Sequence, residues 1–550
     1  MLLSVLLAVI GYTVFVHPVT TYFLDKKSLR QYPGPSIASF SILWRICQIL
    51  KNAHFKAVYN SHQKYGTHVR IGPTQLSISD PRAMNDIYGH GSNFPKDEFY
   101  DAGAGPYRSM ADTRSKEEHQ RKRKLLAHAF AQKTIVGLEP IIQTGLQDLS
   151  RVMVDHANHG TEINLRRVLN YFAIDFMSLV VFGESLGCVQ RGNDIVEART
   201  ADGRVYKVPY IKTLHDMHMH TVLTGAEPAL LSLGSTLLSW HPDVKAGRDW
   251  SNVVRQLCEK RLTIADRDTR QDIFSKFLRN SKGEEMNLDP AEVIVECAVM
   301  MNAGSETNTA VLVSAIYHIY KHPLVLRRVR EELDAVVPVD AVQDIPSYKT
   351  ISNMPYLRAC IDEAMRIQPA STQGFPRVVP KGGRMIAGRF VEEGVTVSVP
   401  TYTLLQDPTA FPDPFDYNPD RWLTGDKSAL HAAFYPFNHG PRACIGRNIS
   451  YLEQLLAVAT IVRSFEIELH NELITIERFN GNPGELFGRV KRRINAACFI
   501  ARISLLMVFD DKASPHFAYG VTLNALISLL APASKPALIF VVSECMGQLK

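Results

Sequence analysis

The segment FNHGPRACIG, residues 437–446, constrains this 550-residue chain more than any other feature. Its cysteine, Cys444, lies four residues after Gly440 and two before Gly446, and Arg442 precedes it by two residues. A lone cysteine among glycines and an arginine suits a metal ligand, a nucleophile or a packed thiol. The sequence around the loop has to distinguish these three.

The cysteine is expected at the start of a helix, because residues 446–464 carry apolar side chains at helical spacing. A helix N-terminus stabilises a thiolate through its dipole and its free N–H groups. Gly440 and Gly446 leave room for a flat ligand near the backbone, and Arg442 can bind a carboxylate through two hydrogen bonds. The loop alone therefore suits a porphyrin site and a buried structural thiol about equally. A nucleophilic cysteine would need a partner histidine, and the loop identifies none.

Composition excludes several classes of protein. The chain is 46% hydrophobic and 21% charged, with a formal net charge of +6. This mild charge comes without the interleaved basic and aromatic residues typical of nucleic-acid binding. Eight cysteines are scattered without CxxC spacing, which argues against a zinc framework or a disulfide scaffold.

The N-terminus predicts a membrane anchor over residues 1–24. Residues 2–24 have no charged side chain, and about 20 apolar residues suffice to span a bilayer. Three basic residues follow at once and predict that the remaining chain lies in the cytosol: Lys26, Lys27 and Arg30. Residues 25–36, which include YPGPS, are interpreted as a stiff hinge.

The body of the chain, residues 37–493, is predicted to be mainly α with small β-sheets. Two segments alternate like hairpins, at 67–80 and 383–402. Helical periodicity is expected at 116–131, 163–182, 290–320, 323–336, 355–367 and 446–464.

An unusual segment lies inside the expected helix 290–320. Gly304 follows Ala303 there, although glycine costs up to about 1 kcal/mol in a helix interior. Glu306 and Thr307 then place an acid and a hydroxyl where apolar residues would pack better. By itself the segment indicates a locally kinked helix.

Two further helical pairs are unremarkable by themselves. Glu363 and Arg366 have the spacing of an ordinary surface ion pair. His119 and Arg123 lie four apart on one helix face.

Taken together, these segments resemble the cytochrome P-450 superfamily over roughly residues 32–493, and they look most like its fungal, microsomal members. The haem-binding pattern FxxGxRxCxG is matched at Phe437, Gly440, Arg442, Cys444 and Gly446. The resemblance implies a haem b whose iron has Cys444 as its axial thiolate ligand.

The resemblance also implies roles for the glycine-containing helix. The gap at Ala303 and Gly304 would admit dioxygen, Thr307 would hydrogen-bond the activated oxygen, and Glu306 would help to deliver protons. The family pattern there is [AG]Gx[DE]T[TS], from which this chain departs only at Asn308.

Two more constellations acquire roles in the same way. His119, Arg123 and Arg377 would reach the haem propionates. Glu363 and Arg366 would form the family's structural triad with Arg421 of NPDRW, because a buried carboxylate between two guanidiniums must be fully paired. The neighbouring cations are expected to face outward, as a solvated face or as a docking patch for an acidic reductase: Arg121, Lys122 and Lys124.

The implied activity is insertion of one atom of O2 into an apolar organic substrate. Electrons would come from NADPH through a reductase, and the enzyme would sit in the endoplasmic reticulum on a single N-terminal anchor, with a possible role in fungal secondary metabolism. Two alternatives stay open: a peroxide-using haem-thiolate isomerase or dehydratase, which would not need Glu306 and Thr307, and a non-catalytic haem sensor.

The resemblance ends near residue 493. Residues 494–550 form an apolar extension, with an uncharged run at 513–534 that contains two prolines. A second membrane helix is possible by length. The favoured interpretation is a gene-model extension without selected structure.

Overall fold

The computed structural model describes residues 11–105, 107–227, 239–264, 272–279, 283–337 and 345–493. The chain divides into two units, Met1–Arg493 and Ile494–Lys550. This division coincides with the boundary expected from the sequence. The predicted extension lies outside the described residues.

The first unit is mainly helical. Its α-helices are α2 (His17–Leu24), α3 (Ser36–Phe40), α4 (Leu43–Leu50), α5 (His54–Tyr65), α6 (Arg82–Tyr88), α7 (Lys116–Leu126), α8 (Gln132–Val136), α9 (Glu139–His159), α10 (Leu165–Phe182), α11 (Cys188–Arg191), α12 (Tyr210–Gly225), α14 (Pro242–Leu262), α15 (Ser275–Leu278), α16 (Pro290–Lys321), α17 (Pro323–Val336), α18 (Tyr348–Ile351), α19 (Pro355–Ile367), α20 (Thr401–Leu405), α21 (Ser428–Ala433) and α22 (Arg447–Ser464). Short helical turns complete the set: η1 (Tyr12–Val16), η2 (Leu29–Gln31), η3 (Glu98–Asp101), η5 (Pro419–Trp422) and η6 (Gly440–Arg442).

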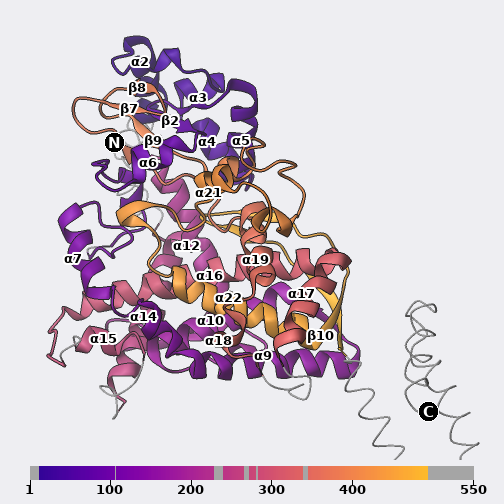
Figure 1. Ribbon diagram of the computed structural model, residues 1–550. Coiled ribbons are helices and arrows are strands. Elements are labelled where there is room, and N and C mark those ends of the chain that lie inside the picture. Colours follow the sequence, from indigo (N-terminus) through magenta and orange to yellow (C-terminus); the bar gives the residue numbers. More distant parts are fainter. Residues whose placement is uncertain are drawn as a thin grey trace, which may run out of the picture. The chain divides into compact units, whose positions relative to one another are not determined.

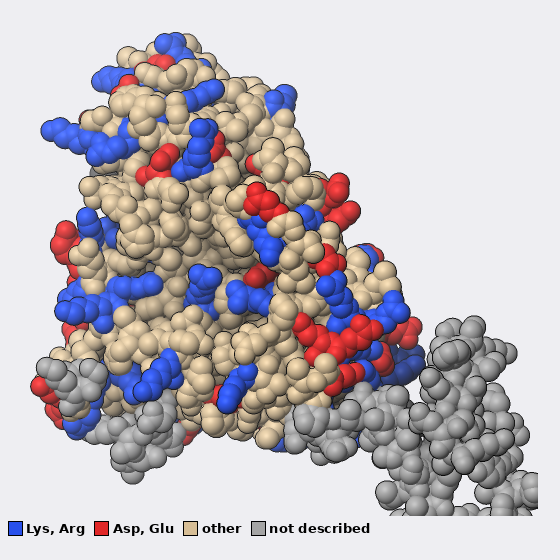
Figure 2. Space-filling model, in the orientation of Figure 1, with Lys and Arg blue, Asp and Glu red and all other residues tan. Residues whose placement is uncertain are grey.

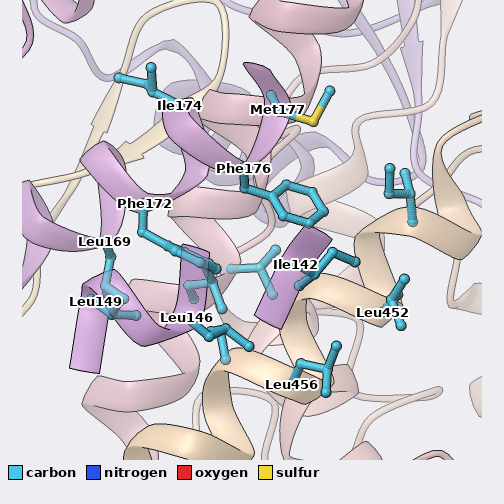
Figure 3. Close-up of a cluster of buried hydrophobic side chains, with 14 of the residues drawn as sticks. Ile142, Leu146, Leu149, Leu169, Phe172, Ile174, Phe176, Met177, Leu452 and Leu456 are labelled. Atoms are coloured by element: carbon cyan, nitrogen blue, oxygen red, sulfur yellow. The ribbon is translucent and has the colours of Figure 1, made fainter. Parts of the chain in front are cut away.

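Four long helices form the main core. In Figure 3, α9 and α10 direct their apolar side chains toward those of α22, with Leu146, Phe172 and Leu456 among them. Helix α16 packs against α10, α19 and α22 and is buried along most of its length. A helix that is apolar nearly all round belongs in such an interior. The segment with Glu306 therefore lies in the centre of the catalytic unit, as Figure 1 shows for α16.

The β-structure is small and lies mostly apart from that core. One sheet has the order β1 (His68–Gly72), β2 (Gln75–Ile78), β9 (Thr396–Ser398), β6 (Arg377–Val378), and a second has the order β10 (Phe465–Leu469), β13 (Phe487–Arg492), β3 (Glu162–Asn164). Two-stranded ribbons complete the set: β4 (Ile195–Arg199) with β5 (Val205–Pro209), β7 (Arg384–Ile386) with β8 (Arg389–Val391), and β11 (Thr475–Glu477) with β12 (Gly481–Pro483). Figure 1 shows β2, β7, β8 and β9 beside the N-terminal helices α2–α5.

Most of the elements expected from the sequence are present. The hairpin 67–80 is β1 paired antiparallel with β2, and α17 and α19 have the expected bounds. The prediction of one hairpin over 383–402 is wrong in its second half. Strands β7 and β8 turn at Ala387 and Gly388, both at positive φ, and β9 then leaves to pair in parallel with β2.

The helix expected at 116–131 is shorter than predicted. Helix α7 ends at Leu126, because the chain then turns to bury Ala129 and Phe130 before α8 begins.

Within the described residues, no helix is both long and apolar enough to cross a membrane. Of the expected anchor, residues 1–10 lie outside that part of the chain, and η1 and α2 make up most of the remainder.

Candidate active site

The cysteine loop is closed by its own backbone. The Cys444 N–H donates to the Phe437 carbonyl at 2.9 Å, and α22 begins three residues after the cysteine. Gly440 has φ +70°, and a Cβ there would lie 1.9 Å from the Tyr88 carbonyl oxygen. Only glycine fits this position, so the glycine of the pattern lets the loop lie directly against α6.

The Cys444 side chain is exposed, but the protein atoms around it still desolvate its sulfur. Burial raises the pKa of the thiol, and the Gly446 N–H, Arg123 and Arg447 lower it by less. The donors at the helix start thus favour the thiolate, as the sequence predicts, but by less than burial opposes it. A cation bound to the sulfur would add to these donors in holding it deprotonated.

A cluster of cations lies near this loop. Arg123 of α7 donates to the Ala443 carbonyl at 2.6 Å, and Arg442 donates to the Thr113 carbonyl at 2.9 Å. Arg377 begins β6 and donates to the Tyr100 hydroxyl at 3.0 Å. The structure thus joins three separate segments that the sequence could relate only through the family resemblance.

Sequence reasoning missed one member, Lys96. It is buried, forms an isolated β-bridge with Arg377, and donates to the Ala111 carbonyl. The only signal for it was a single lysine in the aromatic stretch NFPKDEFY.

The cations of the cluster repel one another. Burial and the nearby Arg377 and Arg442 lower the pKa of Lys96, and burial followed by Arg442 and Lys96 lowers that of His119 to about 4. Burial and Arg377 also lower the pKa of Arg442 to about 10. Among the described residues, Lys96, Arg123, Arg377 and Arg442 form no ion pair with a carboxylate. Such a cluster favours the binding of an anionic ligand.

The face of α16 that carries Ala303 and Thr307 is accessible, although the helix is otherwise deeply buried. Ala303 is exposed, Thr307 is half-buried, and the Thr307 hydroxyl donates to the Ala303 carbonyl at 2.5 Å. A small side chain and a hydroxyl thus lie together at an open point of a core helix.

Gly304 has a packing role that the sequence did not predict. A Cβ at this position would lie 2.2 Å from Sδ of Met177 on α10. The glycine therefore permits α10 and α16 to approach closely, and admission of dioxygen at this gap stays a prediction for Ala303 and Gly304 together.

Glu306 lies 1% exposed and faces away from that accessible side. Its Oε2 accepts hydrogen bonds from Nε2 of His215 on α12, at 3.0 Å, and from Asn482 on β12, while Oε1 accepts one from Asn170 on α10, at 3.4 Å. The structure therefore does not place Glu306 in contact with Thr307, its neighbour in the motif.

Asn308, the one departure from the motif, has buried partners on α22. Its Nδ2 donates to Glu453, and its Oδ1 accepts from Ser450 at 2.5 Å and from Gln454 at 3.1 Å. Burial raises the pKa of Glu453 well above its usual range. The asparagine thus ties the accessible helix to the helix that follows the cysteine loop.

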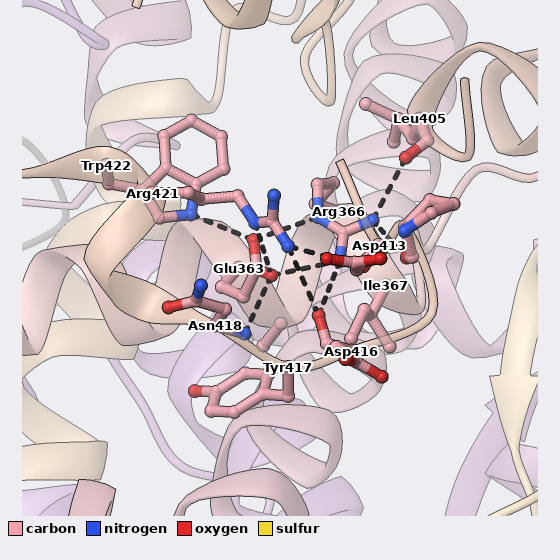
Figure 4. Close-up of polar contacts among 12 residues, drawn as sticks. Glu363, Arg366, Ile367, Leu405, Asp413, Asp416, Tyr417, Asn418, Arg421 and Trp422 are labelled. Atoms are coloured by element: carbon pink, nitrogen blue, oxygen red, sulfur yellow. Dashed lines mark hydrogen bonds and ion pairs between the residues drawn. The ribbon is translucent and has the colours of Figure 1, made fainter. Parts of the chain in front are cut away.

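The structure brings the triad together (Figure 4). Glu363 accepts two hydrogen bonds from Arg366, one from Arg421 and one from the Trp422 indole, each at 2.9 Å. The backbone N–H of Asn418 donates a fifth at 3.0 Å. The side chains of Glu363 and Arg366 are fully buried and that of Arg421 is nearly so, hence both carboxylate oxygens are satisfied without water.

The expectation that three α7 cations face outward is wrong for Lys122. Its ammonium group is buried between Glu292 and Glu296 of α16, because its side chain lies on the same face of α7 as His119. Arg121 is exposed but pairs with Glu118 and Glu292.

The residues present fit a haem. An accessible thiol supplies an iron ligand, and cations without carboxylate partners match two propionates. Cys444 would hold the iron, and His119, Arg123, Arg377, Arg442 and Lys96 would hold the propionates.

Comparison with known proteins agrees with this chemistry. The family model for cytochrome P-450 matches residues 33–488. A benzoate 4-monooxygenase of Aspergillus niger is 31% identical over 90% of this chain and 98% of its own length. A cytochrome P-450 monooxygenase of Penicillium roqueforti is 29% identical over 82% of this chain and 85% of its own, and the pisatin demethylase of Fusarium vanettenii is 27% identical over 85% and 90%.

The C-terminal extension matches a different family. Residues 503–550 match the model of a protein family of unknown function, DUF3176.

A family match over most of the chain, an accessible cysteine in the haem-binding loop and a cationic cluster without carboxylate partners among the described residues agree: the chain belongs to the cytochrome P-450 family of haem-thiolate monooxygenases.

Proposed function

We propose that this monooxygenase inserts one atom of O2 into a medium-sized, apolar, aromatic substrate, with electrons from NADPH delivered through a reductase. The accessible Ala303–Thr307 face of the buried helix α16 carries this proposal, because it puts a hydroxyl beside an exposed, small side chain at one point of the core. The named activities of relatives support the aromatic part of this class: one acts on benzoate and another demethylates pisatin.

The haem supplies the oxidative chemistry when bound. Cys444 would hold the iron, and the cluster around Arg442 would bind the propionates and so orient the ring. Thr307 would offer its hydroxyl to dioxygen and so direct proton transfer. Glu306 and its partners support that transfer from the opposite side of the helix.

Partner and location are part of the same proposal. A reductase would dock where exposed cations remain, and Lys124 is an exposed cation of α7 that forms no ion pair in the described part of the chain. On the face shown in Figure 2, basic and acidic side chains are interspersed, so docking would depend on a few local cations.

We place the protein on the endoplasmic reticulum membrane, with its catalytic unit in the cytosol. The apolar residues 2–24 support this, as does the exposure of Phe15, Phe23 and Leu24. Deleting residues 1–31 should release most of the protein from membranes while its haem spectrum is kept. Undiminished membrane association would argue against a sole anchor here. A role in fungal secondary metabolism is the biological setting we propose.

Reconstitution tests the function. Purified full-length protein, a fungal NADPH reductase and a panel of aromatic acids and phenolic ethers should give substrate-dependent spin shifts and oxygenated products. Thr307→Ala should keep the spin shift but divert NADPH to peroxide, because the hydroxyl that directs protons is lost. Equal product per NADPH in the two proteins would contradict the assignment of Thr307.

A further inference from the structure

The acid of the α16 motif is held by residues of three other elements. His215 of α12, Asn170 of α10 and Asn482 of β12 all donate to the Glu306 carboxylate. The Glu306 side chain is 1% exposed, whereas that of His215 is 12% exposed. The pair therefore joins a core carboxylate to a histidine that reaches solvent.

Glu306 is a poor proton donor in this setting. Burial acts to raise the pKa of Glu306, but His215, Arg166 and His218 outweigh it and lower the pKa to about 2. At pH 7 such a carboxyl carries a proton in only about one molecule in 10⁵. An acid works best when its pKa lies near the working pH.

We propose that His215 takes up the protons used by this enzyme from water and that Glu306 orients it and relays its proton. His215 passes its Nε2 proton to Glu306 Oε2, and the carboxylic acid so formed releases that proton toward the Thr307 side of α16. His215 regains a proton from water. The protons carried in this way are consumed in the reduction of dioxygen, for which NADPH supplies the electrons. This inference rests on the proposed function, because only reduction of dioxygen consumes the protons.

The other titratable groups near Glu306 are less suited than His215 to carry the proton. The charged or titratable side chains around the pair come from α10, α12 and the segment after β11: Arg166, Tyr210, Asp216, His218 and Arg478. His218 lies one turn further along α12 and bonds through Nε2 to Asn302 Oδ1 at 2.9 Å. It is 2% exposed, and burial lowers its pKa to about 4. It is neutral at pH 7 and does not contact Glu306.

The central test compares His215→Gln with His218→Gln. A glutamine can still donate to Glu306 but cannot carry a proton, and the second variant controls for altered packing of α12. With NADPH and reductase, His215→Gln should lower product per NADPH by about 10-fold or more. Turnover driven by added hydrogen peroxide should stay within about twofold of wild type, because that oxidant already brings its protons.

If His215→Gln loses both the NADPH-driven and the peroxide-driven turnover, the role of His215 is structural and the proposal is overturned. An unchanged yield of product per NADPH would overturn it as well. In wild type, the product formed per NADPH consumed should fall as pH rises. This decrease should be absent in His215→Gln. If wild type gives no product with either oxidant, the proposed function itself has failed.

A second readout does not depend on turnover. Without His215 the buried Glu306 loses the largest influence that lowers its pKa, so burial makes its charged form costly. His215→Gln should then melt below wild type and further below it than His218→Gln, which leaves the pair intact. Equal melting temperatures for the two variants would show that His215 does not stabilise the Glu306 carboxylate.

Discussion

Replacing Glu363 with glutamine should destabilise the fold strongly while leaving the shape of the site unchanged. The carboxylate accepts five hydrogen bonds, three of them from guanidinium groups, and both the Glu363 and Arg366 side chains are fully buried. Glutamine has one acceptor oxygen, so its amide group would face donors of Arg366 or Trp422. Removing one partner of a buried ion pair costs about 3–5 kcal/mol.

That cost can be read as a shift in melting temperature. Unfolding entropy is about 2.1 cal/mol/K per residue, or roughly 1 kcal/mol/K for a unit of several hundred residues, so the expected fall is about 3–5 °C. Differential scanning calorimetry of the haem-loaded protein measures it. Glu118→Gln is the matched control, because its i,i+3 partner Arg121 is exposed and such pairs contribute about 0–1 kcal/mol. Equal melting temperatures for the two variants would refute the argument that the buried triad stabilises the fold.

Three further predictions follow from single contacts. Gly304→Ala should lower the free energy of unfolding by about 1–3 kcal/mol, because the added Cβ would clash with the Met177 sulfur. In urea unfolding, adding Met177→Ala should restore part of that stability. An unchanged stability of the single variant would contradict the packing role. Burial raises the pKa of Glu477 to about 7, so its ionised form destabilises the fold above pH 7, and the melting temperature should rise as pH falls through 7. Glu477→Gln should remove this pH dependence. The same pH dependence in the variant would contradict the assignment to Glu477. Truncation after Arg493 should leave haem incorporation and turnover intact, since the catalytic unit ends there; loss of haem would show that the extension belongs to the fold.

The sequence predicted the long helices well because their signals are local. Helices α17 and α19 begin at prolines and end as their apolar periodicity ends, and both have the expected bounds. The second hairpin was misjudged because β9 pairs with β2, more than 300 residues earlier in the chain. No local pattern records such a pairing.

For the site, residue types were predictable and their neighbours were not. The loop pattern identified Cys444 and Arg442, but Lys96 has no motif, and its place in the cluster depends on a bridge to Arg377. The histidine that bonds to Glu306 could not be predicted from the sequence either. His215 lies in an ordinary amphipathic helix, and only the packing of α12 against the core brings it to the carboxylate.

The central claim is that Cys444 binds haem iron as a thiolate, and the spectrum of the reduced, carbon-monoxide-bound protein tests it most directly. Wild-type protein should show the long-wavelength Soret band typical of thiolate-ligated haem. Cys444→Ser should lose that band even where haem is retained, since a neutral hydroxyl does not supply the thiolate's electron density. A wild-type band at the position typical of histidine-ligated haem, or an unshifted band in Cys444→Ser, would contradict the assignment.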